Sequence, residues 1–127
     1  MKEPLYSGIV KDIRSDSRGF VLILEFRGKE YLLFFTKAGF MRGGELHRGK
    51  QYNMLLEGKV KWTQIIHEKC LSHIICAPSF IRTLKETPHM MESITDSLML
   101  EWREFPIEKP VNYYKPYREI IKAKMEK

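Results

Sequence analysis

The chain has 127 residues, of which 43% are hydrophobic, and a formal net charge of +6 from 22 basic and 16 acidic residues. This composition excludes wholesale disorder and leaves room for one domain with an appendage. No apolar run is long enough to cross a bilayer and the first residues lack a secretory signal, so we expect a cytoplasmic protein without a membrane partner. The cysteines, Cys70 and Cys76, are expected to be reduced thiols.

The positive charge is concentrated in the first half of the chain and in its last segment. Residues 1–62 carry a formal charge of +5 and residues 106–127 carry +3, whereas residues 63–105 carry −2. A basic surface attracts polyanions, because neutralising phosphates releases condensed counterions. The charge distribution therefore favours a nucleic-acid partner.

Two apolar runs, Phe20–Phe26 and Tyr31–Phe35, flank a short polar segment that contains Gly28. A glycine between such runs is typical of a β-hairpin, because it adopts a positive φ without steric cost. The turn is either Gly28-Lys29 or Arg27-Gly28, and both placements leave the same side chains on each face. The face predicted to be the core carries Phe20, Leu22, Leu24, Phe26, Tyr31, Leu33 and Phe35. The opposite face, which includes Phe34, is predicted to be half exposed.

Further strands are predicted on both sides of this hairpin. Leu5–Arg14 is predicted to be the first strand, and Lys37–Lys50 to be a glycine-rich loop with at most one short helical turn. Gln51–Trp62 alternates, and Gly58 within it indicates a bulge or a sharp bend. Its predicted buried side chains are Tyr52, Met54, Leu56, Val60 and Trp62. Leu71–Ala77 is predicted to pair back on this strand.

Beyond Pro78, apolar residues recur at the spacing expected of a helix. A helix is predicted over Met91–Phe105, and a last helix is predicted from Tyr117. The apolar stripe of the last helix consists of Tyr117, Ile120, Ile121 and Met125.

Five strands in this order, the second and third forming a tight hairpin, resemble the pattern of an OB-fold barrel. The segment His47–Val60 is similar to the entry into the fourth strand of such domains. We therefore predict a mainly β protein with a five-stranded OB-like barrel over residues 1–80 and a helical C-terminal extension over residues 81–127, which packs on the barrel or on a partner. An SH3-like barrel is the alternative. OB folds usually carry a helix where this chain has the glycine-rich segment Lys37–Lys50, and the helix around Ile94–Trp102 is expected to take its place.

The resemblance implies a binding site for single-stranded nucleic acid across the second and third strands and the loops beside them. Basic side chains would hold the phosphate backbone, and aromatic side chains would stack on bases. Phe34 is the predicted stacking residue, with cover by the C-terminal helices as the alternative. The candidate nucleic-acid-binding residues are Arg14, Arg18, Arg27, Phe34, Thr36, Lys37, Arg42, Arg48, Lys59, Lys61 and Trp62.

Four side chains of types that bind zinc, His67, Cys70, His73 and Cys76, are spaced three residues apart. On a strand the two histidines share one face and the two cysteines the other, so the four do not converge on one ion. We therefore predict no metal site at these residues and no cofactor. The sequence contains no recognisable catalytic motif, which predicts a protein that is not an enzyme.

The predicted function is non-catalytic binding of single-stranded DNA or RNA with low sequence specificity, single strands being favoured over duplexes. The alternative is a protein-interaction or assembly module. In that alternative, the C-terminal helices dock on a protein partner or on a second copy of the chain.

Overall fold

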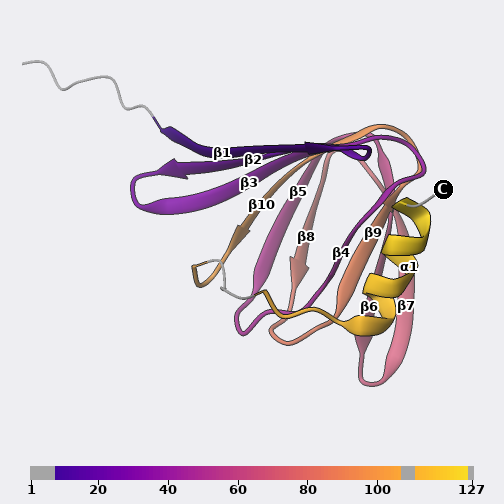
Figure 1. Ribbon diagram of the computed structural model, residues 1–127. Coiled ribbons are helices and arrows are strands. Elements are labelled where there is room, and N and C mark those ends of the chain that lie inside the picture. The colour runs from indigo at the N-terminus through magenta and orange to yellow at the C-terminus, as the bar shows by residue number, and fades with distance from the viewer. Residues whose placement is uncertain (1–7, 107–110, 126–127) are drawn as a thin grey trace, which may run out of the picture.

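A computed structural model of the chain describes residues 8–106 and 111–125, which form ten β-strands and one α-helix (Figure 1). The strands make two antiparallel sheets that face each other as a β-sandwich. In order across the six-stranded sheet lie β1 (Ile9–Asp16), β2 (Gly19–Phe26), β3 (Lys29–Thr36), β10 (Ser97–Arg103), β5 (Gln51–Glu57) and β8 (Ser79–Thr83). In order across the four-stranded sheet lie β4 (Met41–Glu45), β9 (His89–Ser93), β6 (Lys59–Ile66) and β7 (Lys69–Cys76).

The prediction of a mainly β protein with a C-terminal helix is confirmed, but the five-stranded barrel and its SH3-like alternative are wrong. Both sheets are open, because no pairing between described strands joins β1 to β8 or β4 to β7. Strand β10, from the last third of the chain, lies between β3 and β5. The chain after residue 80 thus contributes a central strand to the same sheet as the N-terminal hairpin.

The hairpin predicted around Gly28 is confirmed as β2 and β3. Phe26 pairs with Lys29, so Arg27-Gly28 is the two-residue turn, with φ values of 52° and 76°. A turn with two positive φ angles matches the right-handed twist of the strands that it joins.

The side chains of this hairpin divide between two faces as predicted. However, the face predicted to be the core points outward, and the face predicted to be half exposed packs in the core. Phe34 is only 7% exposed and packs in the core with Leu55, Trp62 and Met99. The side chains predicted to be the core point outward. Together with outward side chains of the neighbouring strands they form what we call the outer apolar face: Val10, Ile13, Phe20, Leu22, Leu24, Phe26, Tyr31, Leu33, Phe35, Tyr52, Met54, Phe80, Leu98, Leu100 and Trp102. Both faces of the hairpin are apolar, so alternation did not reveal which one meets the second sheet.

The strand predicted over Gln51–Trp62 divides at Gly58, where the chain leaves the six-stranded sheet and enters the four-stranded one. The buried positions are odd-numbered before this glycine and even-numbered after it. The predicted burial of Val60 and Trp62 is therefore confirmed, whereas that of Tyr52, Met54 and Leu56 is wrong.

We expect Gly58→Ala to lower the free energy of unfolding by about 3 kcal/mol. Gly58 has a φ of 95°, and a Cβ at this position would collide with the carbonyl oxygen of Asp96. Gly39→Ala is the matched control, because Gly39 also has a positive φ, 87°, but open space around its Cβ. In chemical denaturation, the free energy of unfolding of the control should fall by only about 1 kcal/mol. Equal losses for both variants would contradict the role given to the collision.

The helix predicted over Met91–Phe105 is wrong, because this segment contains β9 and β10. Along β10, Ser97, Met99 and Glu101 are buried and the side chains between them are half exposed, which is the period of a strand. Apolar residues on both faces of β10 also recur at helical spacing, so the period of the sequence does not distinguish this strand from a helix.

The remaining predicted strands are present. Leu71–Ala77 corresponds to β7, which pairs with β6, and Leu5–Arg14 corresponds to β1, although residues 1–7 lie outside the described part of the chain. The predicted loop Lys37–Lys50 contains the short strand β4, which pairs with β9.

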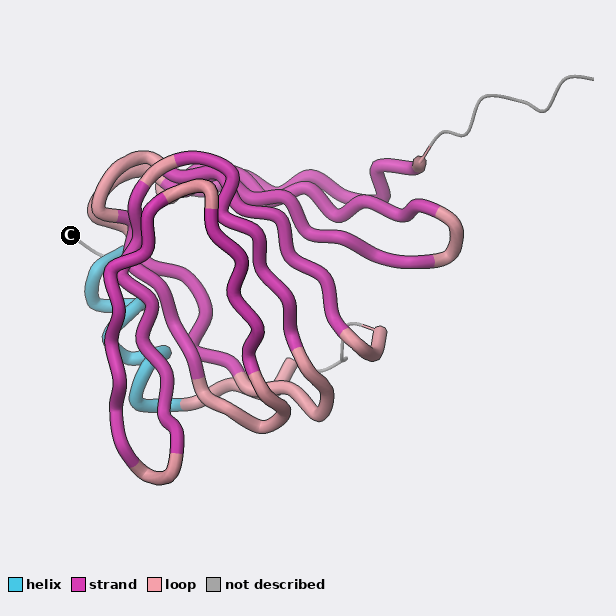
Figure 2. Tube along the Cα trace, turned by 180° about the vertical axis from the view of Figure 1, so that it is seen from behind, coloured by secondary structure: helices cyan, strands magenta, loops and turns pink. Residues whose placement is uncertain are grey.

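The last predicted helix is confirmed as α1 (Lys115–Met125). Tyr117 and Ile121 are buried, and Lys124 lies 3.1 Å from the carboxylate of Glu92 on β9. Figure 2 shows the helix at one side of the molecule, against the four-stranded sheet. In the described ranges, no helix has both the length and the apolar character needed to span a membrane.

Candidate functional site

A cavity of about 710 Å³ lies between the two sheets and extends to the exposed side chains of β1. Pockets that bind small molecules have volumes of roughly 300–1,000 Å³. The cavity is therefore large enough for a small organic ligand.

One part of the cavity wall is apolar. Strands β2 and β3 and the facing sheet contribute Val21, Ile23, Leu32, Phe34, Trp62 and Met91. Phe34, Trp62 and Met91 are almost completely buried. Such a wall favours a ligand with a hydrocarbon or aromatic body, because burying apolar surface is favourable.

A buried hydrogen-bond network forms the wall contributed by β5 and β10. The carboxylate of Glu101 accepts hydrogen bonds from Gln51 Nε2 at 3.2 Å and from Asn53 Nδ2 at 3.1 Å. Its other oxygen accepts from Arg103 Nη2 at 2.9 Å. Polar side chains are stable in a core only when they are paired in this way.

Glu45 of β4 extends this network across the cavity. Its carboxylate lies 3.4 Å from Arg103 Nη2 and 3.3 Å from His47 Nε2. Burial alone would raise the pKa of Glu45, but the hydrogen bond from His47 and the charge of Arg103 hold that pKa below its usual value. Glu45 is therefore ionised at neutral pH.

His89 of β9 lies in an aromatic stack on the same side of the cavity. Its ring is parallel to Trp62 at 5.6 Å between centroids, and His47 lies 5.4 Å away. Its Nδ1 faces the backbone oxygen of Thr87 at 2.9 Å. Burial lowers the pKa of His89 below 6.5, so this ring is neutral at neutral pH.

We expect the folded state to lose stability as the pH falls below 6.5, because His89 binds a proton in the unfolded chain and not in the folded one. Thermal unfolding between pH 7.5 and 5.5 measures this loss. His89→Gln should flatten the dependence, whereas His73→Gln, a change on exposed β7, should leave it as it is. An unchanged slope in the His89→Gln chain would contradict the assignment.

Arg42 of β4 is a buried cation, 8% exposed. Its Nε donates to Thr36 Oγ1 at 2.7 Å, its Nη2 donates to the backbone oxygen of Phe35 at 3.0 Å, and its guanidinium lies 5.7 Å above the ring of Phe34. Burial and the nearby charge of Arg18 lower the pKa of Arg42 to about 10. An anion bound beside Arg42 would offset both effects.

Ion pairs line the mouth of the cavity along β1. Lys11 lies 2.9 Å from Glu30, Arg14 lies 2.8 Å from Asp12, and Arg18 lies 2.7 Å from Asp16. The Arg18 guanidinium holds the pKa of Asp16 below its usual value, and Arg14 does the same for Asp12. These carboxylates are therefore ionised and already neutralised by their partners.

The cavity lining carries an excess of positive charge. Six basic and five acidic side chains line it, and all five acids are in ion pairs with four of the basic residues. Within the described ranges, the other two cations, Arg42 and Arg118, form no ion pair with a carboxylate. Arg118 donates to the backbone oxygen of Gly43 at 3.1 Å, and its guanidinium lies 4.6 Å above the ring of Tyr113.

The donor groups that the described residues place in the cavity do not fit a metal ion. Zinc and related ions need three or more converging protein ligands. No group of three histidine, cysteine, aspartate or glutamate side chains among the described residues converges in this way. His47 and His89 are tilted against each other, and His47 is not part of the cavity lining.

The structure brings together five of the eleven residues predicted to bind nucleic acid. Those at the cavity are Arg14, Arg18, Phe34, Arg42 and Trp62, and Thr36 is fully buried behind Arg42. The others lie elsewhere: Arg27 at the tip of the hairpin, Lys37 after β3, Arg48 after β4, and Lys59 and Lys61 on the exposed side of β6. Phe34 and Trp62 point into the sandwich, so neither lies on an outer surface where a nucleic-acid strand would stack.

Several residues of the cavity were not singled out from the sequence: Glu45, Gln51, Asn53, Glu101 and Arg103. The buried positions change from odd to even numbers at Gly58. For this reason Gln51 and Asn53 were predicted to lie on the exposed face of their strand. Glu101 and Arg103 fell in the segment predicted to be helical. The visible signal was the pair of amides two residues apart on a strand, Gln51 and Asn53, which alternate with Tyr52 and Met54.

His67, Cys70, His73 and Cys76 are exposed on β7 and its turn, and they are not brought together at one site. Cys70 lies on the face that α1 covers, with its Sγ 3.6 Å from Tyr117 Oη.

Comparison of the sequence with protein-family models and with curated proteins found no match. Solved structures do match. CapF of Staphylococcus aureus, described as a capsular polysaccharide assembling protein, superposes with a TM-score of 0.69 over 86% of this chain and 33% of its own, at 12% identity. A variant of oxalate decarboxylase from Bacillus subtilis has a TM-score of 0.73 over 96% of this chain and 37% of its own, at 11% identity. The fold is that of the cupins.

A third cupin structure, the formate complex of oxalate decarboxylase from Lactobacillus farciminis, gives a TM-score of 0.72 at 13% identity, over 99% of this chain and 42% of its own. This chain thus spans about two fifths of the length of these proteins, or less. At such low identities the likeness establishes the fold alone.

The cupin fold, a jelly-roll β-sandwich, corrects three predictions. The resemblance to OB-fold domains is wrong, and the single-stranded nucleic-acid partner implied by it loses its basis. The alternative of a protein-interaction module that uses the C-terminal helices is not supported either, since Met91–Phe105 forms strands and α1 packs on the four-stranded sheet. The prediction that the chain is not an enzyme is also corrected, because oxalate decarboxylases share the fold.

Proposed function

We propose that this chain binds a small anionic organic molecule in the cavity between its two sheets. The observation that carries the proposal is the buried guanidinium of Arg42, which lines this cavity and forms no ion pair with a described carboxylate. Asp16 acts on it only at longer range and is itself paired with Arg18. A carboxylate or similar anion would complete its pairing.

The apolar wall defines the rest of the ligand. A molecule whose anionic end reaches Arg42 would place its body against Phe34, Trp62 and Met91. The side-chain oxygen of Gln51 is buried without a hydrogen-bond partner among the described residues, so it is available to accept a hydrogen bond from a further polar group at the opposite wall. We therefore expect an organic acid with an aromatic or branched body.

Two cupin-fold structures support the choice of an acidic ligand. One is the formate complex of the L. farciminis oxalate decarboxylase, and the other is CapF with the inhibitor 3-isopropenyl-tropolone. CapF in that complex has a TM-score of 0.67 to this chain at 13% identity.

Thermal unfolding of the full chain with a panel of small molecules tests the proposal. The panel is benzoate, phenylacetate, succinate, inorganic phosphate and benzamide, which is the neutral analogue of benzoate. Benzoate and phenylacetate should raise the unfolding temperature in a concentration-dependent way, because a ligand of the folded state stabilises it by mass action. Equal stabilisation by benzamide and benzoate, or none by any anion, would contradict the proposal.

Turnover of the bound acid is a second candidate. It is favoured by the ionised carboxylate of Glu45 and the neutral imidazole of His89, which line the same cavity as Arg42. Proton NMR of each panel acid incubated with the chain would detect conversion, and unchanged spectra would leave binding as the function.

A further inference from the structure

Three buried polar atoms at the cavity have no hydrogen-bond partner among the described residues. They are Oε1 of Gln51, Nη1 of Arg103 and Nε1 of Trp62, and all three residues line the cavity. An unpaired polar atom in a core is costly, so each is expected to have a partner when the site is filled. The anionic group proposed for Arg42 leaves these atoms to recognise a second polar group.

Gln51 and Arg103 offer an acceptor and a donor side by side. The two residues are directly opposite each other on β5 and β10, so their side chains share a face, about 5 Å apart at Cβ. The amide nitrogen of Gln51 donates to Asn53 and to Glu101, which fixes Oε1 as the remaining acceptor. Arg103 donates to Glu101 through Nε and Nη2, which leaves Nη1 as the remaining donor.

A hydroxyl is the smallest group that satisfies such an acceptor and such a donor together. Its O–H donates one hydrogen bond, here to Gln51 Oε1, and its oxygen accepts another, here from Arg103 Nη1. A second carboxylate fits less well, because it only accepts and would lie near the carboxylates of Glu101 and Glu45. An ammonium group only donates and would lie beside a guanidinium.

Trp62 brings a second donor to this end of the cavity from the facing sheet. Its ring lies parallel to His89 at 5.6 Å, and His89 is opposite Glu45, which lies 3.4 Å from Arg103 Nη2. The indole Nε1 is a donor only. A hydroxyl oxygen has two lone pairs, which is enough for both Trp62 and Arg103.

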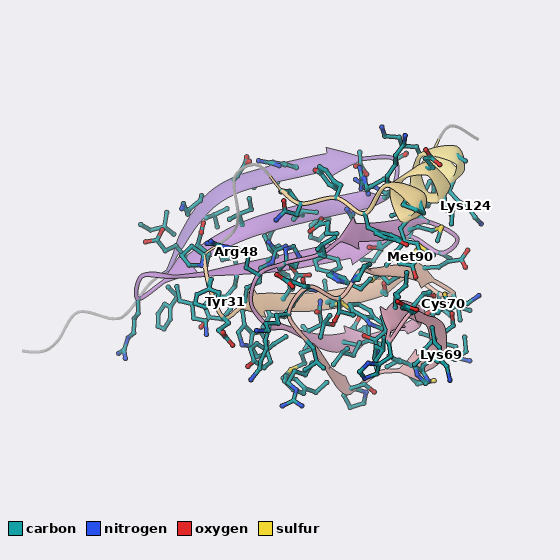
Figure 3. The ribbon with its side chains drawn as sticks, turned by 90° about the horizontal axis from the view of Figure 1, so that it is seen from below. Tyr31, Arg48, Lys69, Cys70, Met90 and Lys124 are labelled. Atoms are coloured by element: carbon teal, nitrogen blue, oxygen red, sulfur yellow. The ribbon has the colours of Figure 1, made fainter. Side chains whose placement is uncertain are left out.

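This second polar position lies at the opposite end of the cavity from Arg42. Arg42 is near the start of β4, whereas Gln51 begins β5 and Arg103 ends β10, and Figure 1 shows these strand ends at the top and the bottom of the sandwich. Figure 3 shows the molecule from the lower end, with Tyr31 of the six-stranded sheet on one side and Met90 of the four-stranded sheet on the other.

The separation of the two ends sets the length of the ligand. The guanidinium of Arg42 lies above the ring of Phe34, and Phe34 is opposite Met99 on β10. Met99 and Arg103 are four residues apart on this strand, a distance of about 13 Å. Allowing about 3 Å for a hydrogen bond at each end leaves about 7 Å between the two polar ends of the ligand. One para-substituted benzene ring spans this separation.

On the basis of the anion-binding function proposed above, we infer that the ligand of this cavity is a hydroxylated aromatic acid. Its carboxylate lies at Arg42, and its hydroxyl, on the far side of the ring, bonds to Gln51 Oε1 and Arg103 Nη1. The ring between them packs against Phe34 and Trp62. An analogue without the hydroxyl is rejected, because it leaves a buried acceptor and a buried donor unpaired.

Isothermal titration of the full chain with 4-hydroxybenzoate and 4-methylbenzoate tests this ligand class. The two acids have nearly the same shape, and both carry the carboxylate that Arg42 binds. We expect 4-hydroxybenzoate to bind about 10- to 100-fold more tightly, since one of its two new hydrogen bonds is to a charged group. Equal affinities would overturn the hydroxyl position and leave anion binding intact. No binding of either acid would overturn both.

Two variants locate the hydroxyl. Gln51→Met removes the acceptor oxygen at similar volume, and Arg103→Lys keeps a cation for Glu101 but removes Nη1. Each should reduce the preference for 4-hydroxybenzoate over 4-methylbenzoate to less than about 3-fold. The preference is a ratio measured within one variant, so a general loss of affinity does not change it. Circular dichroism checks that both variants are folded.

Thr83→Val is the matched control. Thr83 is directly opposite Gln51 on β8, and its buried Oγ1 also has no partner among the described residues, but Thr83 does not line the cavity. The preference for 4-hydroxybenzoate should therefore be unchanged in this variant. A preference that survives both Gln51→Met and Arg103→Lys, or one that is lost in Thr83→Val, overturns the assignment of the hydroxyl.

Discussion

Arg42→Gln is expected to weaken the binding of benzoate by about 10- to 100-fold while the chain stays folded, since a hydrogen bond to a charged group contributes about 1.5–3 kcal/mol. Arg42 is the cavity's buried cation without a carboxylate partner in the described part of the chain, so its loss removes the excess charge that favours an anion. Glutamine retains a donor for Thr36, which preserves the packing behind the cavity. Isothermal titration of both chains with benzoate measures the change.

Arg14→Gln is the matched control for this result. Arg14 also lines the cavity, but it is exposed and already paired with Asp12 at 2.8 Å. Exposed ion pairs contribute little, so the control should change the affinity less than about 3-fold. A similar loss in both variants would indicate that general charge at the mouth attracts the anion. In that case Arg42 would not be the binding residue.

The second large effect is expected at Glu101. Glu101→Leu should lower the free energy of unfolding by about 3–5 kcal/mol, because it removes the buried carboxylate that pairs with the guanidinium of Arg103 and also accepts from the amides of Gln51 and Asn53. Arg103 retains only the longer contact to Glu45, 3.4 Å. Urea denaturation measures the loss, and Glu119→Leu, an exposed change on α1, should alter stability by less than about 0.5 kcal/mol.

A double variant separates the loss of pairing from the loss of packing. Adding Arg103→Met to Glu101→Leu removes the stranded charge and replaces the pair with apolar groups, which is often close to neutral for a buried ion pair. We therefore expect the double variant to be more stable than Glu101→Leu alone. A double variant that is less stable still would contradict the view that an unpaired Arg103 causes the loss.

The local strand pattern could be predicted from the sequence because short-range signals specify it. Gly28 between two apolar runs predicted the β2–β3 hairpin, and the alternation around Val60 and Trp62 predicted β6. The larger arrangement could not be predicted, since it depends on which strands pair across long separations. Strand β10 lies between β3 and β5 but follows both at a long distance in the sequence, and nothing local in Ser97–Arg103 indicates this pairing.

The inverted faces of the hairpin have a physical reason. Alternation divides side chains into two sets but does not say which set meets the second sheet, and here both sets are apolar. The outward set, which includes Phe20, Leu33 and Phe35, consists of apolar and aromatic side chains and therefore has the composition expected of a buried face.

The cavity was visible in the sequence only in part. Arg42, Phe34 and Trp62 were singled out as a cation and two aromatic rings near a binding face, and they do lie at one cavity. The ligand class was wrong, because these side chains point into the sandwich instead of outward. Glu101 and Arg103 could not be found, since their role depends on β10 facing Gln51 and Asn53 across strand pairs that the sequence does not reveal.

The most direct test of the ligand site uses Trp62 as a reporter in the wall of the cavity. The chain has two tryptophans, so Trp102→Phe leaves Trp62 as the only one. Titrating this chain with benzoate should change the Trp62 emission in a saturable way that weakens with added salt and is lost in Arg42→Gln. The neutral analogue benzamide should have little effect. An emission that benzoate leaves unchanged, or that benzamide changes equally, would contradict an anion-binding cavity between the sheets.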